Sequence, residues 1–276
     1  MKSTLLRPFR DSIERVPLLA ESYRLVRDYV KFRRSTPKPT PLGFKLTGNR
    51  KMESGAFEPV ETQLIKGELE RAEVFVDVGA NVGYYTCLAR SLGRQVVAIE
   101  PSTATLRLLF ANLVANEMRD VEVFPVGLSD KAEVAVLYGG GGNASLLLGW
   151  STSTKVYSEV IPTTTLDRLL EARFAGQRLF IKIDIEGLEY RCLLGATHTL
   201  SRDVAPTWFL EIYLDQGHRE GLNPNFLATF ELFWNHGYEA REAVPAGRII
   251  DRDTVKRWID AGRVDSPSAN YVFAKR

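Results

Sequence analysis

A short glycine-containing segment and a later acidic residue have the spacing of a nucleoside-binding site. The segment runs from Asp77 to Gly83 (DVGANVG) after an apolar stretch, and Glu100 follows Gly79 by 21 residues. Glycines at such a turn allow ligand and backbone to approach closely, and a carboxylate about 20 residues further on can bind both ribose hydroxyls. The chemistry that this pattern favours is the binding of an adenosine-containing molecule.

Three interpretations of this segment compete. A dinucleotide normally requires Gly-x-Gly-x-x-Gly, but only Gly79 and Gly83 are present here, and Ala80 and Asn81 occupy the turn. Asp77 would also repel a pyrophosphate, whereas it suits the cationic sulfonium and ammonium of S-adenosylmethionine. A purely structural tight turn does not explain acids at the ends of two consecutive strands. We therefore expect S-adenosylmethionine, with a dinucleotide as the alternative ligand.

A second group of acids has the spacing to act on an acceptor molecule. Residues 181–186 read IKIDIE, and their alternation predicts Asp184 and Glu186 on one face at the end of a strand, with Glu211 ending the next strand. Converging carboxylates could position or deprotonate a weakly nucleophilic hydroxyl. They could also hold Mg²⁺ or another divalent cation. Both alternatives make these three residues candidates for the chemical step.

A structural interpretation competes with this catalytic one. Glu186 and Glu189 could complement the positive end of the following helix, because acids stabilise a helix N-terminus. Lys182 could pair with Asp77 or with Asp184, since a buried charge requires a partner. Under this interpretation the acids stabilise the fold.

A histidine and several polar or aromatic residues are further candidates. His218 lies in the loop after the stretch that ends at Glu211 and could be the base, because its ordinary pKa suits proton transfer near neutral pH. An acceptor pocket could also be lined by Asn143, Ser145, Trp150 and Tyr213. Trp150 and Tyr213 are equally explained by packing.

These residues can meet only if the elements between them form a layered sheet. From Arg71 onward, strand-like apolar stretches alternate with amphipathic ones, which predicts a parallel sheet covered by helices. Ligands of such sheets bind at the carboxyl ends of the strands. The strands expected in this pattern span residues 74–78, 96–100, 121–126, 179–185 and 207–213, with an additional strand at 133–138 and a terminal hairpin at 238–243 and 271–274.

The first part of the chain differs in charge from the remainder. Residues 1–50 carry twelve Lys or Arg against four Asp or Glu, and apolar residues at helical spacing predict two amphipathic helices broken at Pro17. These helices could pack on the domain, mediate self-association, or attach the chain to an anionic membrane surface through residues 1–34. We expect a basic helical extension and linker at 1–56 and a single α/β domain at 57–276.

Composition bounds the class of protein and its surroundings. The chain of 276 residues is 45% hydrophobic and 25% charged, as in soluble globular proteins. It contains no apolar run long enough to span a membrane and no signal peptide, so we expect a cytoplasmic protein, with a peripheral position at the inner membrane surface as an alternative. The domain has no basic stripe with interleaved aromatic residues, so we expect no nucleic acid partner.

Seven motifs occur in an order that resembles one protein family, the FkbM-type methyltransferases. The resemblance covers roughly Phe57 to the end of the chain. The motifs are DVGANVGYYT (77–86), AIEPS (98–102), NLVAN (112–116), GLSD (127–130), TTLD (164–167), KIDIEGLE (182–189) and NYVF (270–273).

The resemblance implies a class I methyltransferase (Rossmann-like) fold with a seven-stranded, mostly parallel sheet whose last strand is antiparallel. It also implies O-methylation of a hydroxyl, often on a sugar of a glycan, glycolipid or natural product. A lipid, polyketide or small phenol is the alternative acceptor, and an inactive donor-binding or scaffold module is the alternative of another class. The donor-binding residues implied are Asp77, Gly79, Ala80, Asn81, Gly83, Glu100, Pro101, Ser129 and Asp130.

Overall fold

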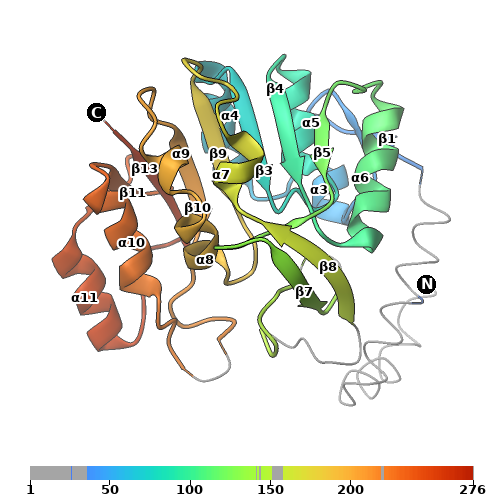
Figure 1. Ribbon diagram of the computed structural model, residues 1–276. Helices are drawn as coiled ribbons and strands as arrows, with labels where there is room; N and C mark the ends of the chain where they lie inside the picture. Colours follow the sequence, from blue (N-terminus) through green and yellow to red (C-terminus); the bar gives the residue numbers. More distant parts are fainter. Residues whose placement is uncertain are drawn as a thin grey trace, which may run out of the picture.

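The computed structural model describes residues 26, 36–140, 142, 144–150, 158–218 and 221–275 (Figure 1). The amphipathic helices expected within residues 1–34 and the candidate Asn143 therefore lie outside the described residues, apart from Val26. Among the described residues, no helix has both the length and the apolar character that crossing a membrane requires.

A mixed sheet of eight strands forms the centre of the described structure. Five adjacent strands run parallel, and β13 runs antiparallel between β10 and β11. From one edge to the other the strands are β12 (Ile249–Ile250), β11 (Glu239–Glu242), β13 (Asn270–Ala274), β10 (Thr207–Glu211), β9 (Leu179–Ile183), β3 (Val74–Val78), β4 (Gln95–Ile99) and β5 (Glu122–Phe124). This is the class I methyltransferase architecture that we expected, with one strand more than seven because the short β12 pairs with β11 at the edge.

Successive residues of a strand point to opposite sides of the sheet, so apolar side chains emerge on both faces, and helices cover both. On β3, Val74, Val76 and Val78 belong to one buried cluster, whereas Phe75 belongs to the other. The first cluster contains residues of α7 (Leu166–Leu170), α8 (Glu189–Leu194), α9 (Thr197–Leu200), α10 (Phe226–Asn235) and α11 (Arg252–Ala261). The second contains residues of α3 (Arg50–Glu53), α4 (Pro59–Arg71), α5 (Tyr84–Ser91) and α6 (Thr103–Ala115).

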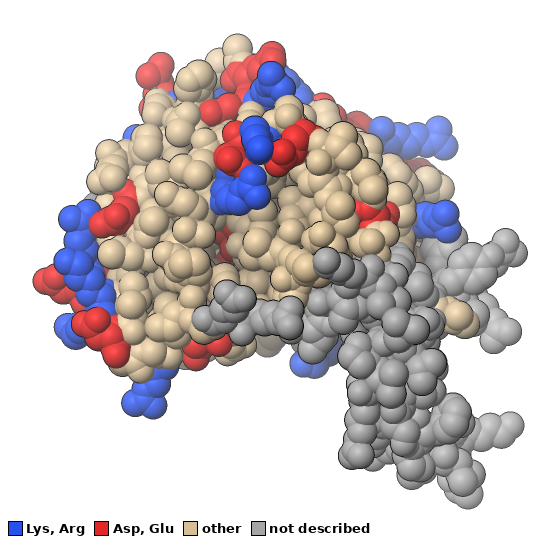
Figure 2. All heavy atoms as spheres, turned by 60° about the horizontal axis from the view of Figure 1, so that its bottom comes forward, with Lys and Arg blue, Asp and Glu red and all other residues tan. Residues whose placement is uncertain are grey.

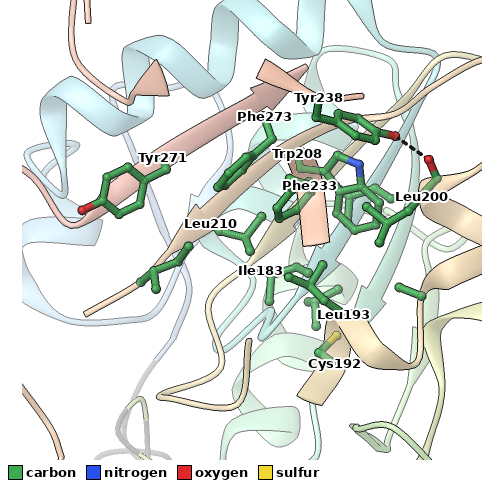
Figure 3. Close-up of a cluster of buried hydrophobic side chains, with 14 of the residues drawn as sticks. Ile183, Cys192, Leu193, Leu200, Trp208, Leu210, Phe233, Tyr238, Tyr271 and Phe273 are labelled. Atoms are coloured by element: carbon green, nitrogen blue, oxygen red, sulfur yellow. Dashed lines mark hydrogen bonds between the residues drawn. The ribbon is translucent and has the colours of Figure 1, made fainter. Parts of the chain in front are cut away.

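The aromatic part of the first cluster joins the terminal hairpin to the parallel strands (Figure 3). Phe233 of α10 stacks on Phe273 of β13 with ring centroids 3.8 Å apart, and Trp208 of β10 meets Phe233 edge-on at 5.6 Å. All three side chains are buried. This packing holds β13 beside β10, and therefore holds the strand end that carries Glu211.

A second, three-stranded sheet lies at the end of the molecule where the parallel strands terminate (Figure 1). It includes the additional strand that the sequence predicted at residues 133–138. The Glu159 carboxylate of its central strand accepts hydrogen bonds from Ser102 Oγ at 3.0 Å and from the Thr103 amide at 3.1 Å, which ties this sheet to the start of α6. In spatial order the strands are β6 (Gly127–Leu128), β8 (Ser158–Thr164) and β7 (Glu133–Tyr138).

The residues just before α4 contribute to the core. Strands β1 (Lys38–Pro39) and β2 (Lys45–Leu46) form a hairpin, and Leu46 is fully buried in the second cluster. Asn112 of α6 accepts a hydrogen bond from the Thr47 amide at 2.7 Å and donates one back to the Thr47 carbonyl. Part of the segment that the sequence assigned to an extension and linker therefore packs on the domain.

Candidate functional site

The turn after β3 brings two strands and two helices close together. Gly79 has a φ of +80°, and a Cβ atom there would lie 1.9 Å from the backbone oxygen of Asp184. Gly83 has a φ of +85° and precedes α5, where a Cβ would lie 2.4 Å from Leu109 of α6. Both positions therefore require glycine for packing, in addition to the ligand approach that the sequence suggested.

Glu100 lies between this turn and the start of α6. Its Oε2 accepts a hydrogen bond from the Asn81 amide and its Oε1 accepts one from the Ser102 amide, each at 2.9 Å. Burial raises the pKa of Glu100 to about 7. Each carboxylate oxygen can accept a second hydrogen bond, so the residue fits the expected contact with ribose hydroxyls.

Asp77 of β3 and Lys182 of β9 are both buried and lie side by side in the register of the two strands. Thr86 Oγ1 donates to Asp77 Oδ2 at 2.6 Å, whereas Asp77 Oδ1 is buried without a hydrogen-bond partner among the described residues. Burial raises the pKa of Asp77 above its ordinary value. A buried carboxylate with a free oxygen fits a cationic ligand, as S-adenosylmethionine is.

Lys182 is the counter-charge of the site. Its Nζ lies 2.8 Å from Asp184 Oδ2, which selects Asp184 from the two partners that the sequence left open. Burial alone lowers the pKa of Lys182, but the charges of Asp184 and Asp77 outweigh it and raise that pKa above its ordinary value. Lys182 therefore keeps its charge and balances the two acids.

The strand that carries these acids ends earlier than expected. β9 ends at Ile183, so the predicted alternation through residue 186 is wrong beyond that point. Glu186 has a φ of +56° and Gly187 one of +92°, conformations that cannot continue a strand. Glu186 instead turns toward Trp150, whose Nε1 donates to its Oε2 at 2.6 Å. Burial, then the Asp184 charge, raises the pKa of Glu186 to about 7.

Glu211 lies at the end of β10, near enough to Asp184 for the charge of Asp184 to raise its pKa. It accepts a hydrogen bond from Tyr213 OH at 2.8 Å. Burial, then the charge of Asp184, raises the pKa of Glu211 to about 9, so Glu211 carries a proton at neutral pH. Burial raises the pKa of Tyr213, and the charges of Glu211, Asp184 and Glu186 raise that pKa further.

A cavity of about 390 Å³ opens beside Glu211. It lies between the end of β10, the start of β13 and the start of α4, and its lining is mostly polar. Lining residues include Glu58, Glu61, Glu211, Tyr213, Ser268 and Asn270.

Sequence reasoning missed Glu58. Its backbone has a φ of 42° and a ψ of 64°, immediately before α4, and Tyr85 OH donates to its Oε2 at 2.7 Å. Burial raises its pKa, opposed by the nearby Lys182 charge. No local pattern marks Glu58, because its contacts come from parts of the chain that are distant in sequence.

His218 lies on the Trp150 side of the site. Its ring meets the Trp150 ring edge-on with centroids 4.8 Å apart, and its Nε2 is buried without a hydrogen-bond partner among the described residues. Burial lowers the pKa of His218, which favours the neutral ring that a base requires.

The remaining donor-site candidates belong to three different parts of the chain, after β3, after β4 and after β6. The Ala80 amide donates to the Ile99 carbonyl at 3.0 Å, and Pro101 leads from β4 toward α6. Ser129 Oγ donates to Asp130 Oδ1 at 2.8 Å, and Arg191 of α8 lies 2.6 Å from the same oxygen. Asp130 is therefore held by α8.

The divalent cation expected at Asp184, Glu186 and Glu211 does not fit this arrangement. Across the described part of the chain, no group of three or more His, Cys, Asp or Glu side chains is placed to hold a metal ion. Lys182 takes the position of a cation beside Asp184, and Trp150 binds Glu186.

The surface around the strand ends carries few charges. Figure 2 views the molecule obliquely from this end, and most of the described surface there is uncharged, with a mixed group of basic and acidic side chains above the middle and others toward the margins.

Comparison with protein families finds one match over most of the domain. A family model described as the methyltransferase FkbM domain matches residues 77–240. That span includes the turn after β3, Glu100, the acids after β9 and β10, and His218. Glu58 and the cavity residues of β13 lie outside it.

Curated proteins and solved structures show more distant similarity. Cobalt-precorrin-6B C(15)-methyltransferase (decarboxylating) of Salmonella typhimurium is 33% identical over 94 residues, which cover 32% of this chain and 49% of that protein. The match thus spans about half the length of that relative. A precorrin-6y C5,15-methyltransferase from Geobacter metallireducens aligns with a TM-score of 0.40 at 13% identity, covering 71% of this chain and 78% of that one. A SAM-dependent methyltransferase from Agrobacterium tumefaciens aligns with a TM-score of 0.44 at 11% identity, covering 87% and 69%.

Proposed function

This chain belongs to the FkbM methyltransferase family, and from that premise we propose that it transfers a methyl group from S-adenosylmethionine to a hydroxyl of a sugar-containing acceptor. One observation carries the proposal more than any other. Asp184 is paired with Lys182, its backbone oxygen lies against Gly79 of the expected donor turn, and its charge acts on Glu211, which lines the polar cavity. A carboxylate in this position can receive the proton that an attacking hydroxyl must lose.

The donor supplies a methyl group on a sulfonium, which is a good leaving group. Asp184 takes the proton of the acceptor hydroxyl while the new O–C bond forms and the C–S bond breaks, with its electron pair remaining on sulfur. Lys182 orients the Asp184 carboxylate through its 2.8 Å ion pair. Glu211 holds its own proton, so it acts as a hydrogen-bond donor beside Asp184. The enzyme's main task is alignment of the two reactants.

The sugar assignment rests on the lining of the cavity. Carboxyl, hydroxyl and amide groups of Glu58, Glu61, Ser268 and Asn270 can each bind a hydroxyl of the ligand, and the Tyr213 ring lies beside them. A lipid or a polyketide would require a mainly apolar lining. A hydroxyl-rich acceptor therefore suits these residues better.

Calorimetric titration tests the donor. S-adenosylmethionine and its demethylated product should both bind, and NAD should not, because Asp77 repels a pyrophosphate. Binding of NAD alone would contradict the family-based assignment of the ligand.

Methyl transfer to a panel of free sugars, lipid-linked sugars and small phenols tests the acceptor and the base. Asp184→Asn should lower kcat by roughly 10²–10⁴-fold, the usual contribution of a general base. Asp120→Asn changes an exposed carboxylate in the same way and should retain full activity. Normal turnover by Asp184→Asn would refute the assignment of the base, and transfer to phenols alone would refute the sugar.

A further inference from the structure

Trp150 fills a slot between the two loops that follow β9 and β10. Only 3% of the residue is exposed. A Cβ atom at Gly187 would lie 2.3 Å from the indole ring, and one at Gly217 would lie 2.5 Å from it. Both glycines also have positive φ values, +92° and +80°. Any side chain at either position would collide with the ring, so the two loops are shaped around this tryptophan.

The segment that carries Trp150 binds Glu186 at two points. Trp150 Nε1 donates to Glu186 Oε2 at 2.6 Å, and Ser145 Oγ donates to the Glu186 carbonyl at 2.7 Å. Residues 144–150 belong to the connection between β7 and β8, outside the main sheet. The connection between two strands of the smaller sheet therefore orients Glu186, which follows the end of β9.

The backbone of Glu186 needs such support. A non-glycine residue with a φ of +56° is strained, and this conformation persists only where the surroundings hold it. Its carboxylate accepts the Trp150 indole N–H, and it follows Asp184 by two residues, so that the charge of Asp184 acts on it. The His218 ring packs edge-on against the same indole. Trp150 thus contacts two of the candidate catalytic residues.

We propose that Trp150 is a positioning residue for methyl transfer, which fixes the orientation of the Glu186 carboxylate and keeps the loops after β9 and β10 at a fixed separation. The inference rests on the proposed function, because it gives Glu186 a part in the methyl transfer for which the proposed function assigns Asp184 as the base. Trp150 itself touches neither reactant in this role. Its indole N–H is the group that matters most.

A double-mutant cycle in the full chain tests the proposal. Trp150→Phe keeps an aromatic ring in the slot but is smaller and lacks the N–H donor, so we expect kcat to fall about tenfold and the Tm to fall as well, while the Kd for S-adenosylmethionine stays nearly unchanged. In the Glu186→Gln background, Trp150→Phe should lower kcat less than twofold further, since the two residues act as one unit. Trp234→Phe, on α10 away from the site, is the matched control and should retain full activity.

The outcomes separate this inference from the proposed function. Equal loss of kcat in both backgrounds, or no loss in either, would overturn the positioning role. The indole N–H resonance of Trp150 in NMR spectra, identified by its disappearance in Trp150→Phe, should move when Glu186 becomes Gln. A resonance that does not move would overturn the contact whatever the activity. Absence of methyl transfer by the unaltered protein would contradict the proposed function, and the NMR measurement would still decide the contact.

Discussion

Lys182 is the side chain on which the charges of the site depend. Its ammonium is buried between Asp77 and Asp184, and both acids would lose their counter-charge without it. A buried acid that loses its partner costs much more than the pair contributes when it is intact.

We therefore expect Lys182→Met to lower the free energy of unfolding by about 3–5 kcal/mol, measured by chemical denaturation. Lys131→Met is the control, because Lys131 forms an exposed pair with Glu133 and should change stability by less than about 1 kcal/mol. Equal losses in the two variants would show that the buried lysine has no special role.

Glu100 should make donor binding depend on pH. Burial raises its pKa to about 7, so the carboxylate that accepts ribose hydroxyls becomes protonated below that value. Because the pKa of Glu100 is raised in the folded state, the folded state binds this proton more tightly than the unfolded state does. The protonated Glu100 therefore adds to the free energy of unfolding at low pH, and this contribution is lost as pH rises through 7. Donor affinity has the opposite sign and falls as the solution becomes more acidic.

Calorimetric titration of S-adenosylmethionine between pH 8 and pH 6 should show a Kd that rises below pH 7, approaching tenfold per pH unit. Glu100→Gln should bind more weakly at pH 8 and lose this dependence. A Kd with the same pH dependence in both proteins would assign the titration to another group.

The ends of β3 and β9 are held together by a close backbone contact. A Cβ at Gly79 would lie 1.9 Å from the Asp184 carbonyl, and the φ of +80° adds backbone strain for any other residue. The contact matters for chemistry because it places the donor turn beside Asp184.

Gly79→Ala should destabilise the protein by about 2–4 kcal/mol in chemical denaturation and weaken donor binding, because the two strand ends must separate. Gly93→Ala is a matched control. Gly93 has nearly the same φ, +79°, but no atom lies within 4 Å of its added Cβ. Gly93→Ala should lower the free energy of unfolding only by the backbone cost, about 1 kcal/mol. Similar values for both would mean that the contact with Asp184 adds nothing.

The molecule as a whole depends on aromatic packing that joins its terminal hairpin to the parallel strands. Phe233 stacks on Phe273 and meets Trp208, so α10, β13 and β10 are connected through one ring (Figure 3). The start of β13 also lines the cavity beside Glu211. Loss of this packing would therefore reach the acceptor side of the site.

Phe233→Ala should lower the free energy of unfolding by about 3–5 kcal/mol, as large-to-small changes in a core do. Phe110→Ala removes a ring that is 47% exposed on α6 and should cost much less. Thermal and chemical denaturation of the two variants measures the difference, and equal costs would contradict this view of the core.

The sequence by itself determined the alternation of strands and helices, the antiparallel closing strand and the turn after β3. Val74–Val78 was predicted to the residue, because local apolar patterning and the glycines that follow it define a buried strand end. The family was recognisable for the same reason, since its motifs are short and local. The spacing of Glu100 also required no knowledge of distant contacts.

Only the tertiary structure decided which distant groups meet those residues. It ended β9 at Ile183, selected Asp184 as the partner of Lys182, added Glu58 to the site and brought Trp150 to Glu186. Each of these outcomes depends on burial, or on contacts between segments far apart in the chain. Periodicity and spacing depend on residues that are neighbours along the chain. The raised pKa of Glu211 and the slot for Trp150 arise instead where segments distant in sequence pack together.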